Sequence, residues 1–322
     1  MSDVVRIGTR ASELALRQAR LVETALAARG VSCELVTFTT TGDRRLDQPL
    51  SSIGAKGLFT RELEVALMDG KVDCCVHSLK DLPTSQPKGL DVVALLERED
   101  PRDVLVVNPS GRADSVESLP PGSRVGTSSL RRRAQLAALR PDLEIVELRG
   151  NVPTRLRKVD AGDVHAAILA AAGLIRLGVE SRITQFLEPP RWLPAAGQGA
   201  IAIQARLADH ALLEVLGSLD HAPTSISTRA EREFLAALEG GCQVPIGALA
   251  TAQFTESGEC MVLHGFVSDV AGHEFVRGSH QVDQAAPEES GRALAAELRT
   301  RGATNLLMEL RSADQLIAPQ PE

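Results

Sequence analysis

The chain has 322 residues, of which 43% are hydrophobic and 24% are charged, a composition typical of a globular protein long enough to form two or three domains. No apolar run approaches the roughly 20 residues that span a bilayer, and the N-terminus lacks the apolar stretch of a secretory signal, so we expect no membrane segment and a cytoplasmic location. The net charge of -7 argues against general binding of nucleic acid.

The first hundred residues alternate short β-branched runs with segments of helical periodicity. Strands that alternate with helices in this way form βαβ units, which predict a mostly parallel sheet covered by helices. We expect strands at 4–9, 33–41, 72–78 and 91–97 and helices at 11–29 and 61–70.

A second unit of the same kind follows and ends near a cluster of three prolines, Pro189, Pro190 and Pro194. From His221 onward the pattern changes to two helices that flank three strand-like runs, which predicts a smaller α+β domain. We expect strands at 103–109, 123–127, 144–150, 165–171, 248–254, 260–267 and 273–279, and helices at 129–140, 225–238 and 288–301.

The segment from Gly240 to Pro245 places Cys242 on a turn, where two glycines free the backbone and a proline ends it. Taken alone, such a cysteine is more often a small buried hydrophobe than a reactive thiol. The five cysteines have no C-x-x-C spacing and the seven histidines no metal-ligand spacing, so we expect neither a disulfide framework nor a metal site.

Arginine dominates the basic residues, with thirty Arg against five Lys, although a genomic bias toward arginine explains part of this excess. Between Arg124 and Arg157 there are eight arginines and only three acidic residues. Because a guanidinium group can bind a carboxylate through two parallel hydrogen bonds, this basic patch favours a small polyanionic ligand. A solvated basic face is the alternative interpretation.

Two strand-to-helix turns, at 8–12 and 126–132, carry small hydroxyl residues and arginines where a helix N-terminus favours anions. Ser12 and Ser128 also suit the role of helix N-cap. The segment VHSLKDLPT places Lys80 and Asp81 after a predicted buried strand. A carboxylate there can stabilise a developing cation, although an aspartate before a proline turn is more often structural.

Lys56 and Phe59 lie in the glycine-flanked run GAKGLF. It follows a polar stretch, 44–56, whose composition predicts a mobile lid. The glycine spacing does not match a phosphate-binding P-loop.

Nine stretches, in order, resemble the porphobilinogen deaminase (hydroxymethylbilane synthase) family and cover about residues 4–250: RIGTRAS, KGLF, VHSLKDLP, EREDPRD, GTSSLRR, LRGNVPTRL, ILAAAGL, PAAGQGA and EGGCQVPIG. The resemblance implies two doubly wound, periplasmic-binding-protein-like α/β domains with a smaller C-terminal α+β domain. It implies a first domain at 1–100 plus 198–219, a second at 103–194 and a third at 221–322.

The resemblance also implies a reaction. Four porphobilinogen molecules are joined, each with loss of ammonia, into hydroxymethylbilane on a dipyrromethane cofactor, which a thioether bond attaches to Cys242. The enzyme is expected to be a monomer, and Asp81 is its implied catalytic residue. The implied cofactor-binding residues are Lys80, Ser129, Arg131, Arg132, Arg149, Gly150 and Arg155, and the implied substrate-binding residues are Arg10, Ser12, Lys56, Phe59, Thr127, Ser128, Arg176 and Gln198.

One position departs from the family's pattern, because Ser52 stands where the best-matched bacterial members have a second lysine. Two other functions stay open at this point. A two-lobed module that binds a small carboxylate without chemistry has the same periodicity, but it needs no displayed thiol such as Cys242. RNA binding through SLRRRAQ is weakened by the negative net charge and by only eight aromatic residues.

Overall fold

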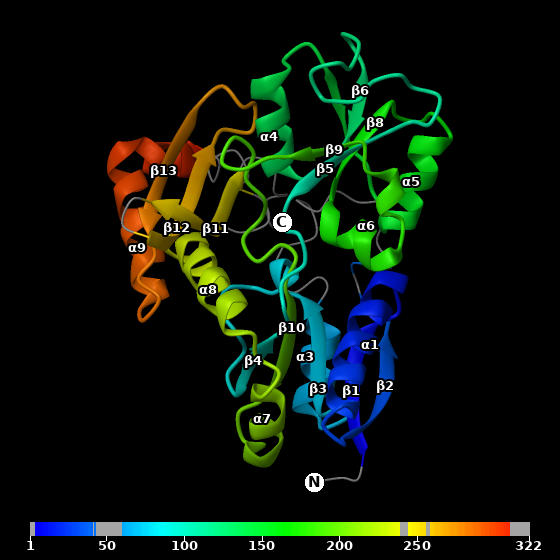
Figure 1. Cartoon of the computed structure of the whole chain (residues 1–322), viewed down its shortest axis with the longest axis vertical. Coiled ribbons are helices and arrows are strands. Elements are labelled where there is room, and N and C mark those ends of the chain that lie inside the picture. Colours follow the sequence, from blue (N-terminus) through cyan, green and yellow to red (C-terminus); the bar gives the residue numbers. More distant parts are fainter. Residues whose placement is uncertain (1–3, 41, 43–59, 239–243, 256–257, 310–322) are drawn as a thin grey trace, which may run out of the picture.

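The structure is a computed structural model that describes residues 4–40, 42, 60–238, 244–255 and 258–309. Figure 1 shows two α/β lobes, one above the other, with a C-terminal domain beside them. The first lobe is mainly blue and cyan, with one strand and one helix in green to yellow-green; the second is mainly green, and the C-terminal domain runs from yellow to red. Within the described residues, none of the helices combines the length and the apolar character needed to cross a bilayer.

The first lobe is built on a five-stranded sheet with the order β2-β1-β3-β10-β4. Strands β1 (Val4–Arg10), β2 (Ser32–Phe38), β3 (Cys74–Ser78) and β4 (Leu90–Leu95) run in one direction, and β10 (Ile201–Arg206) runs against them. Helices α1 (Glu13–Ala27) and α7 (His210–Gly217) cover one face, where Ile7 and Val76 are buried. Helix α3 (Arg61–Met68) covers the other face, so the sheet is doubly wound.

The second lobe repeats this plan with the order β7-β6-β8-β5-β9. Strand β5 (Asp103–Val107) is antiparallel to its neighbours β8 (Ala166–Ala170) and β9 (Gln185–Leu187), whereas β6 (Arg124–Gly126) and β7 (Glu144–Val146) are parallel to β8. Helix α4 (Leu130–Leu139) packs on one face, and α5 (Val152–Asp160) and α6 (Ala171–Leu177) pack on the other. The chain crosses between the lobes at 96–102 and again at 188–200, and each crossing leads into the antiparallel strand of the sheet it enters.

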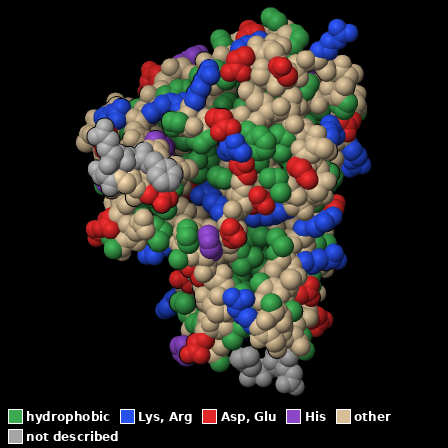
Figure 2. Space-filling view, viewed as in Figure 1, with side chains coloured by type: hydrophobic (Ala, Val, Ile, Leu, Met, Phe, Trp, Pro, Cys, Tyr) green, Lys and Arg blue, Asp and Glu red, His purple; other side chains and the backbone are tan. Residues whose placement is uncertain are grey.

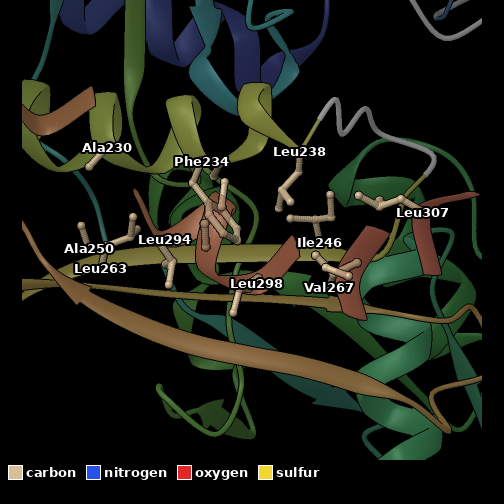
Figure 3. Close-up of a cluster of buried hydrophobic side chains, with 14 of the residues drawn as sticks. Ala230, Phe234, Leu238, Ile246, Ala250, Leu263, Val267, Leu294, Leu298 and Leu307 are labelled. Atoms are coloured by element: carbon tan, nitrogen blue, oxygen red, sulfur yellow. The ribbon is translucent and has the colours of Figure 1, made fainter. Parts of the chain in front are cut away.

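The C-terminal domain packs an antiparallel sheet against two helices. Its strands are β11 (Ile246–Thr255), β12 (Gly258–Ser268) and β13 (Phe275–Gln281), and its helices are α8 (Ala222–Ala237) and α9 (Pro287–Leu298). Phe234, Leu263 and Leu294 are fully buried between the two layers (Figure 3). The turn between β12 and β13 also reaches the second lobe, because a Cβ on Gly272 would lie 2.2 Å from the carbonyl oxygen of Ala134 in α4.

The fold class expected from the sequence is confirmed, with two doubly wound α/β lobes and a smaller α+β domain. Several expected elements have different bounds. The strand expected at 144–150 stops at Val146, and α8 begins at Ala222 rather than 225, because Pro223 fits the first helical turn. Strands β9 and β10 had not been predicted from periodicity. Short turns of helix lie at η2 (Leu79–Asp81), η3 (Glu180–Arg182) and η4 (Arg299–Ala303).

Candidate functional site

The candidate site lies where the two lobes face each other. Arg10 ends β1, and the η2 turn carries Lys80 and Asp81 directly after β3. Arg131 and Arg132 lie in the first turn of α4, opposite them in the second lobe. Figure 2 shows Lys and Arg side chains gathered across the middle of the molecule, where the lobes meet. Carboxyl ends of strands and N-termini of helices form ligand sites in sheets of this type.

Asp103, at the start of β5, is the fully buried centre of a hydrogen-bond network. Arg131 Nη1 donates to its Oδ2 at 2.6 Å, and Arg132 donates to its Oδ1 from Nε at 3.1 Å and from Nη2 at 2.7 Å. Trp192 Nε1 donates to Oδ2 at 2.8 Å. Burial disfavours the charged carboxylate, but the two guanidinium groups outweigh this effect and hold the pKa of Asp103 well below its usual range.

This network changes how the two predicted arginines are understood. Arg131 and Arg132 are each 5% exposed, and Arg131 also donates from Nη1 to the Leu193 carbonyl at 2.7 Å. Many of their N–H groups therefore already donate hydrogen bonds to Asp103 or to backbone carbonyls. Sequence reasoning missed Asp103, although it lies within the motif EREDPRD at the start of a strongly apolar strand.

Gln198 links Asp103 to the first lobe. Its Nε2 donates to Asp103 Oδ1 and to the Pro101 carbonyl, both at 2.8 Å, and its Oε1 accepts a 3.2 Å hydrogen bond from Lys80 Nζ. Burial lowers the pKa of Lys80 to about 8, although the nearby Asp81 acts in the opposite direction. Lys80 is thus a cation whose burial the surrounding carboxylates do not fully compensate.

Arg155 and its neighbours lie at the start of α5. Asn151 caps this helix by accepting a 2.9 Å bond from the amide of Thr154. Gly150 has a φ of 110°, and a Cβ there would lie 2.7 Å from a methyl group of Thr154, so the turn requires glycine. Arg155 Nε donates to the Gly150 carbonyl at 2.8 Å, and burial lowers the pKa of Arg155 to about 10. Arg149 Nε is paired with Glu147 at 2.5 Å.

Arg176, on α6, completes the cationic set from the second lobe. Its Nη2 donates to the Gly199 carbonyl at 2.5 Å, in the segment that returns to the first lobe. Burial lowers the pKa of Arg176 to about 10, and the charge of Glu99 offsets this only in part. Helix α6 also packs against α1, with a Cβ on Gly173 lying 3.8 Å from Leu14, so Arg176 sits where the lobes touch.

The predicted hydroxyl residues have local structural partners. Ser12 and Ser129 act as N-caps of α1 and α4, each accepting a 3.4 Å hydrogen bond from a backbone amide. Thr127 Oγ1 accepts from the amide of Ser129 at 3.2 Å. Ser128 donates its only hydroxyl proton to the Leu148 carbonyl at 2.7 Å, so its hydroxyl oxygen can only accept a hydrogen bond from any further group. The N-cap interpretation thus holds for Ser12 but not for Ser128.

Helix α8 attaches the C-terminal domain to the site through two neighbouring residues. Glu231 is fully buried and bonds to both terminal nitrogens of Arg98, at 2.6 and 3.0 Å. It also accepts from the backbone amide of Gly197 at 2.7 Å. Arg232 donates to backbone carbonyls on either side of Lys80 and Asp81. None of these contacts was predicted, because each joins segments far apart in the sequence.

Several predicted positions lie outside the described residues. They are Cys242, Lys56, Phe59 and Ser52, together with the proposed lid at 44–56. In the part of the chain that is described, no group of three His, Cys, Asp or Glu residues is placed to hold a metal ion.

The donor set suits a ligand with several carboxylates. Lys80, Arg155 and Arg176 come from different elements, and burial dominates the pKa of each. A buried cation is stabilised by an anion that replaces its lost hydration. A dipyrromethane whose pyrrole rings carry carboxylate side chains would supply such anions, so the residues present fit that group.

Comparison with known proteins identifies relatives along most of the chain. Residues 5–214 match the family model described as porphobilinogen deaminase, dipyromethane cofactor binding domain, and residues 226–300 match porphobilinogen deaminase, C-terminal domain. A curated porphobilinogen deaminase from Moorella thermoacetica is 50% identical over 310 residues, which cover 96% of this chain and 97% of the relative.

Two solved structures are similar to the chain at much lower sequence identity. A periplasmic substrate-binding protein of an ABC transporter from Coxiella burnetii is 18% identical, with a TM-score of 0.42, and covers 71% of this chain and 96% of its own. A nutrient binding protein from Burkholderia cenocepacia is 15% identical, with a TM-score of 0.43, and covers 66% of this chain and 89% of its own.

Proposed function

The chain belongs to the porphobilinogen deaminase family, and from this premise we propose that the facing ends of its two lobes bind the cofactor and the substrate. The enzyme is a transferase of tetrapyrrole biosynthesis, which joins four porphobilinogen molecules into hydroxymethylbilane with loss of ammonia. Its cofactor is dipyrromethane. What we propose is which residues perform each part of this reaction.

The observation that carries the proposal is the uncompensated burial of cations at the site. Lys80 comes from the first lobe and Arg155 and Arg176 from the second, and burial lowers the pKa of all three. Carboxylates of the cofactor and of the growing chain would restore these pKa values and gain charge-assisted hydrogen bonds. We propose that Arg10, Arg132 and Arg149 also bind these carboxylates.

Asp81 is proposed as the catalytic residue. Burial lowers the pKa of Lys80 and of Arg155, and the negative charge of Asp81 opposes this at both, so Asp81 is electrostatically coupled to cations of both lobes. As ammonia leaves the substrate, positive charge develops on the pyrrole, and a preorganised carboxylate lowers the barrier by opposing that charge. The same carboxylate can accept a hydrogen bond from a pyrrole N–H.

Cys242 is proposed as the attachment point of the cofactor, which supplies the primer for chain growth. Lys80, Ser129, Arg131, Arg132, Arg149, Gly150 and Arg155 would hold that primer, and Arg10, Ser12, Lys56, Phe59, Thr127, Ser128, Arg176 and Gln198 would contact the substrate. We also propose the division into domains at 1–100 plus 198–219, 103–194 and 221–322. The position of β10 in the first sheet supports it.

We further propose that the enzyme acts as a monomer in the cytoplasm, without a nucleic-acid partner. Few large apolar side chains of the described residues are exposed, and they belong to several elements. The cysteines that are described, Cys33, Cys74, Cys75 and Cys260, are all free thiols, which suits a reducing compartment. The net charge of -7 disfavours contact with nucleic acid.

Intact mass and turnover of purified variants test these roles. We expect wild-type protein to be heavier than its sequence by one dipyrromethane, and Cys242→Ser to lack this increment. Asp81→Ala should keep a folded structure but lose turnover by about 10²- to 10³-fold, as is typical when one preorganised electrostatic group is removed. An increment that survives in Cys242→Ser would move the attachment elsewhere, and normal turnover of Asp81→Ala would remove that residue from the mechanism.

A further inference from the structure

Arg232, on α8 of the C-terminal domain, hydrogen-bonds to the turn of the first lobe that carries Lys80 and Asp81. Its Nη1 donates to the carbonyls of Leu79 at 3.3 Å and Leu82 at 3.1 Å, and its Nη2 donates to the carbonyl of Pro83 at 2.7 Å. These three carbonyls bracket the turn on both sides. One guanidinium group therefore sets the path of the backbone through the catalytic position.

The chemistry of Arg232 is unusual for a residue that only stabilises an interface. Burial lowers its pKa, which the charge of Asp91 opposes only in part, and its side-chain hydrogen bonds to described residues go to neutral carbonyls. A buried arginine that is not directly paired with a carboxylate loses hydration free energy that a pair such as Arg98–Glu231 recovers through charge. The contribution of Arg232 is instead to geometry, because its planar guanidinium group has several N–H donors and fixes the relative positions of the carbonyls that it binds.

The turn lies between a small apolar cluster and a pocket that Arg232 also lines. The side chains of Leu79 and Leu82 are buried in a small apolar cluster. Behind the turn, however, a cavity of about 420 Å³ lies between β4 and α8, and both Leu79 and Arg232 line it. Arg232 contacts the turn from the side of this pocket, where its directional hydrogen bonds add to the packing of the two leucines.

We propose that Arg232 is a positioning residue, which holds the carboxylate of Asp81 at a fixed place relative to α8. Helix α8 ends at Ala237, shortly before Cys242 in the sequence. Arg232 thereby ties the helix that leads to the cofactor thiol to the turn that carries the catalytic carboxylate. This inference rests on the proposed roles of Asp81 and Cys242.

The test compares Arg232→Gln with Arg229→Gln, a control on the same helix whose arginine makes an exposed pair with Glu288 at 2.5 Å. For Arg232→Gln we expect an unchanged cofactor mass increment and a KM within about twofold of wild type. Its kcat should fall by about 10- to 100-fold, since a displacement of about 1 Å in a reacting group can cost that much. Arg229→Gln should keep both constants, and Arg232→Lys should recover part of kcat because one ammonium can reach one carbonyl.

A double variant distinguishes a positioning role of Arg232 from a general loss of stability. If Arg232 acts through Asp81, then adding Arg232→Gln to Asp81→Glu should lower kcat by less than about threefold, because the carboxylate is already misplaced. Multiplicative losses in the double variant, or an unchanged kcat in Arg232→Gln, would overturn the proposal. If Arg232→Gln does not fold, Arg232→Lys in the same cycle gives the answer. Absence of the mass increment from wild-type protein would instead refute the proposed function.

Discussion

At the residue scale, the site depends on how its charges are balanced. Asp103 faces two guanidinium groups, so one positive charge remains near the lobe interface after pairing. Lys80 contributes a second positive charge, and Gln198 connects it to Asp103 by a hydrogen bond to each. The protein thus keeps a surplus of positive charge for a polyanionic ligand while it satisfies the buried carboxylate completely.

The balance at Asp103 makes its charge essential for folding. Asp103→Asn keeps the shape and one acceptor but leaves Arg131 and Arg132 buried without a counter-charge. We expect the free energy of unfolding to fall by about 3–5 kcal/mol in denaturant titrations. Asp142→Asn, which disrupts the exposed pair with Arg140, should cost far less, because solvent screens exposed ion pairs. A loss at Asp103 as small as that of the control would contradict the role given to the network.

His77 gives the stability a dependence on pH. It is 6% exposed on β3, and burial lowers its pKa from 6.5 to about 4, with Arg10 acting in the same direction and Gln204 against it. Between these two pH values the unfolded chain binds a proton that the folded chain does not, so stability falls as pH falls. We expect the wild type to lose up to about 1.4 kcal/mol per pH unit relative to His77→Gln in this range. Parallel stability curves of the two proteins between pH 6.5 and 4 would exclude this role.

At the scale of elements, the turn between β12 and β13 is fitted to helix α4. Gly272 has a φ of 75°, and its missing Cβ leaves room for the Ala134 carbonyl. Gly30 has nearly the same φ, 77°, but has no atom within 4 Å of its would-be Cβ. A side chain at Gly30 would cause backbone strain alone. A side chain at Gly272 would cause the same strain and also a clash between the C-terminal domain and the second lobe.

This comparison gives a prediction. Gly30→Ala should lower the free energy of unfolding by about 1–2 kcal/mol through backbone strain alone. Gly272→Ala should cost at least about 1 kcal/mol more, because a Cβ 2.2 Å from a helix carbonyl forces the turn away from α4. Thermal or chemical unfolding measures both values. Equal losses would mean that the turn moves away from α4 without cost.

Sequence reasoning succeeded for elements whose apolar pattern is local. The alternating runs around Ile7 and Val76 predict their strands, and the amphipathic pattern of α1 predicts its helix. It failed for β9 and β10, because a short buried run carries no sign of its partner strand or direction. The predicted arginines 131 and 132 do lie at the expected helix start. Their pairing with Asp103 depends on a contact across 28 or 29 positions, which no local pattern encodes.

At the scale of the whole molecule, the three parts meet at the two crossings between the lobes. Gln198 bonds to Asp103 and to Lys80, while Glu231 holds Arg98 and the amide of Gly197. Residues from both lobes and from the C-terminal domain thus share one continuous polar network. A change in the position of one part is transmitted to the others through buried, directional bonds rather than through loose surface contacts.

The insertion of β10 between β3 and β4 has a consequence for biosynthesis on the ribosome. The first sheet cannot close until residues 201–206 have been translated, whereas every strand of the second sheet is already present by Leu187. The second lobe can therefore fold first, although its strands come later in the chain than β1 to β4. The turn with Lys80 and Asp81 gains its hydrogen bonds from Arg232 only after that residue emerges, so the proposed catalytic position is among the last features of the nascent protein to be completed.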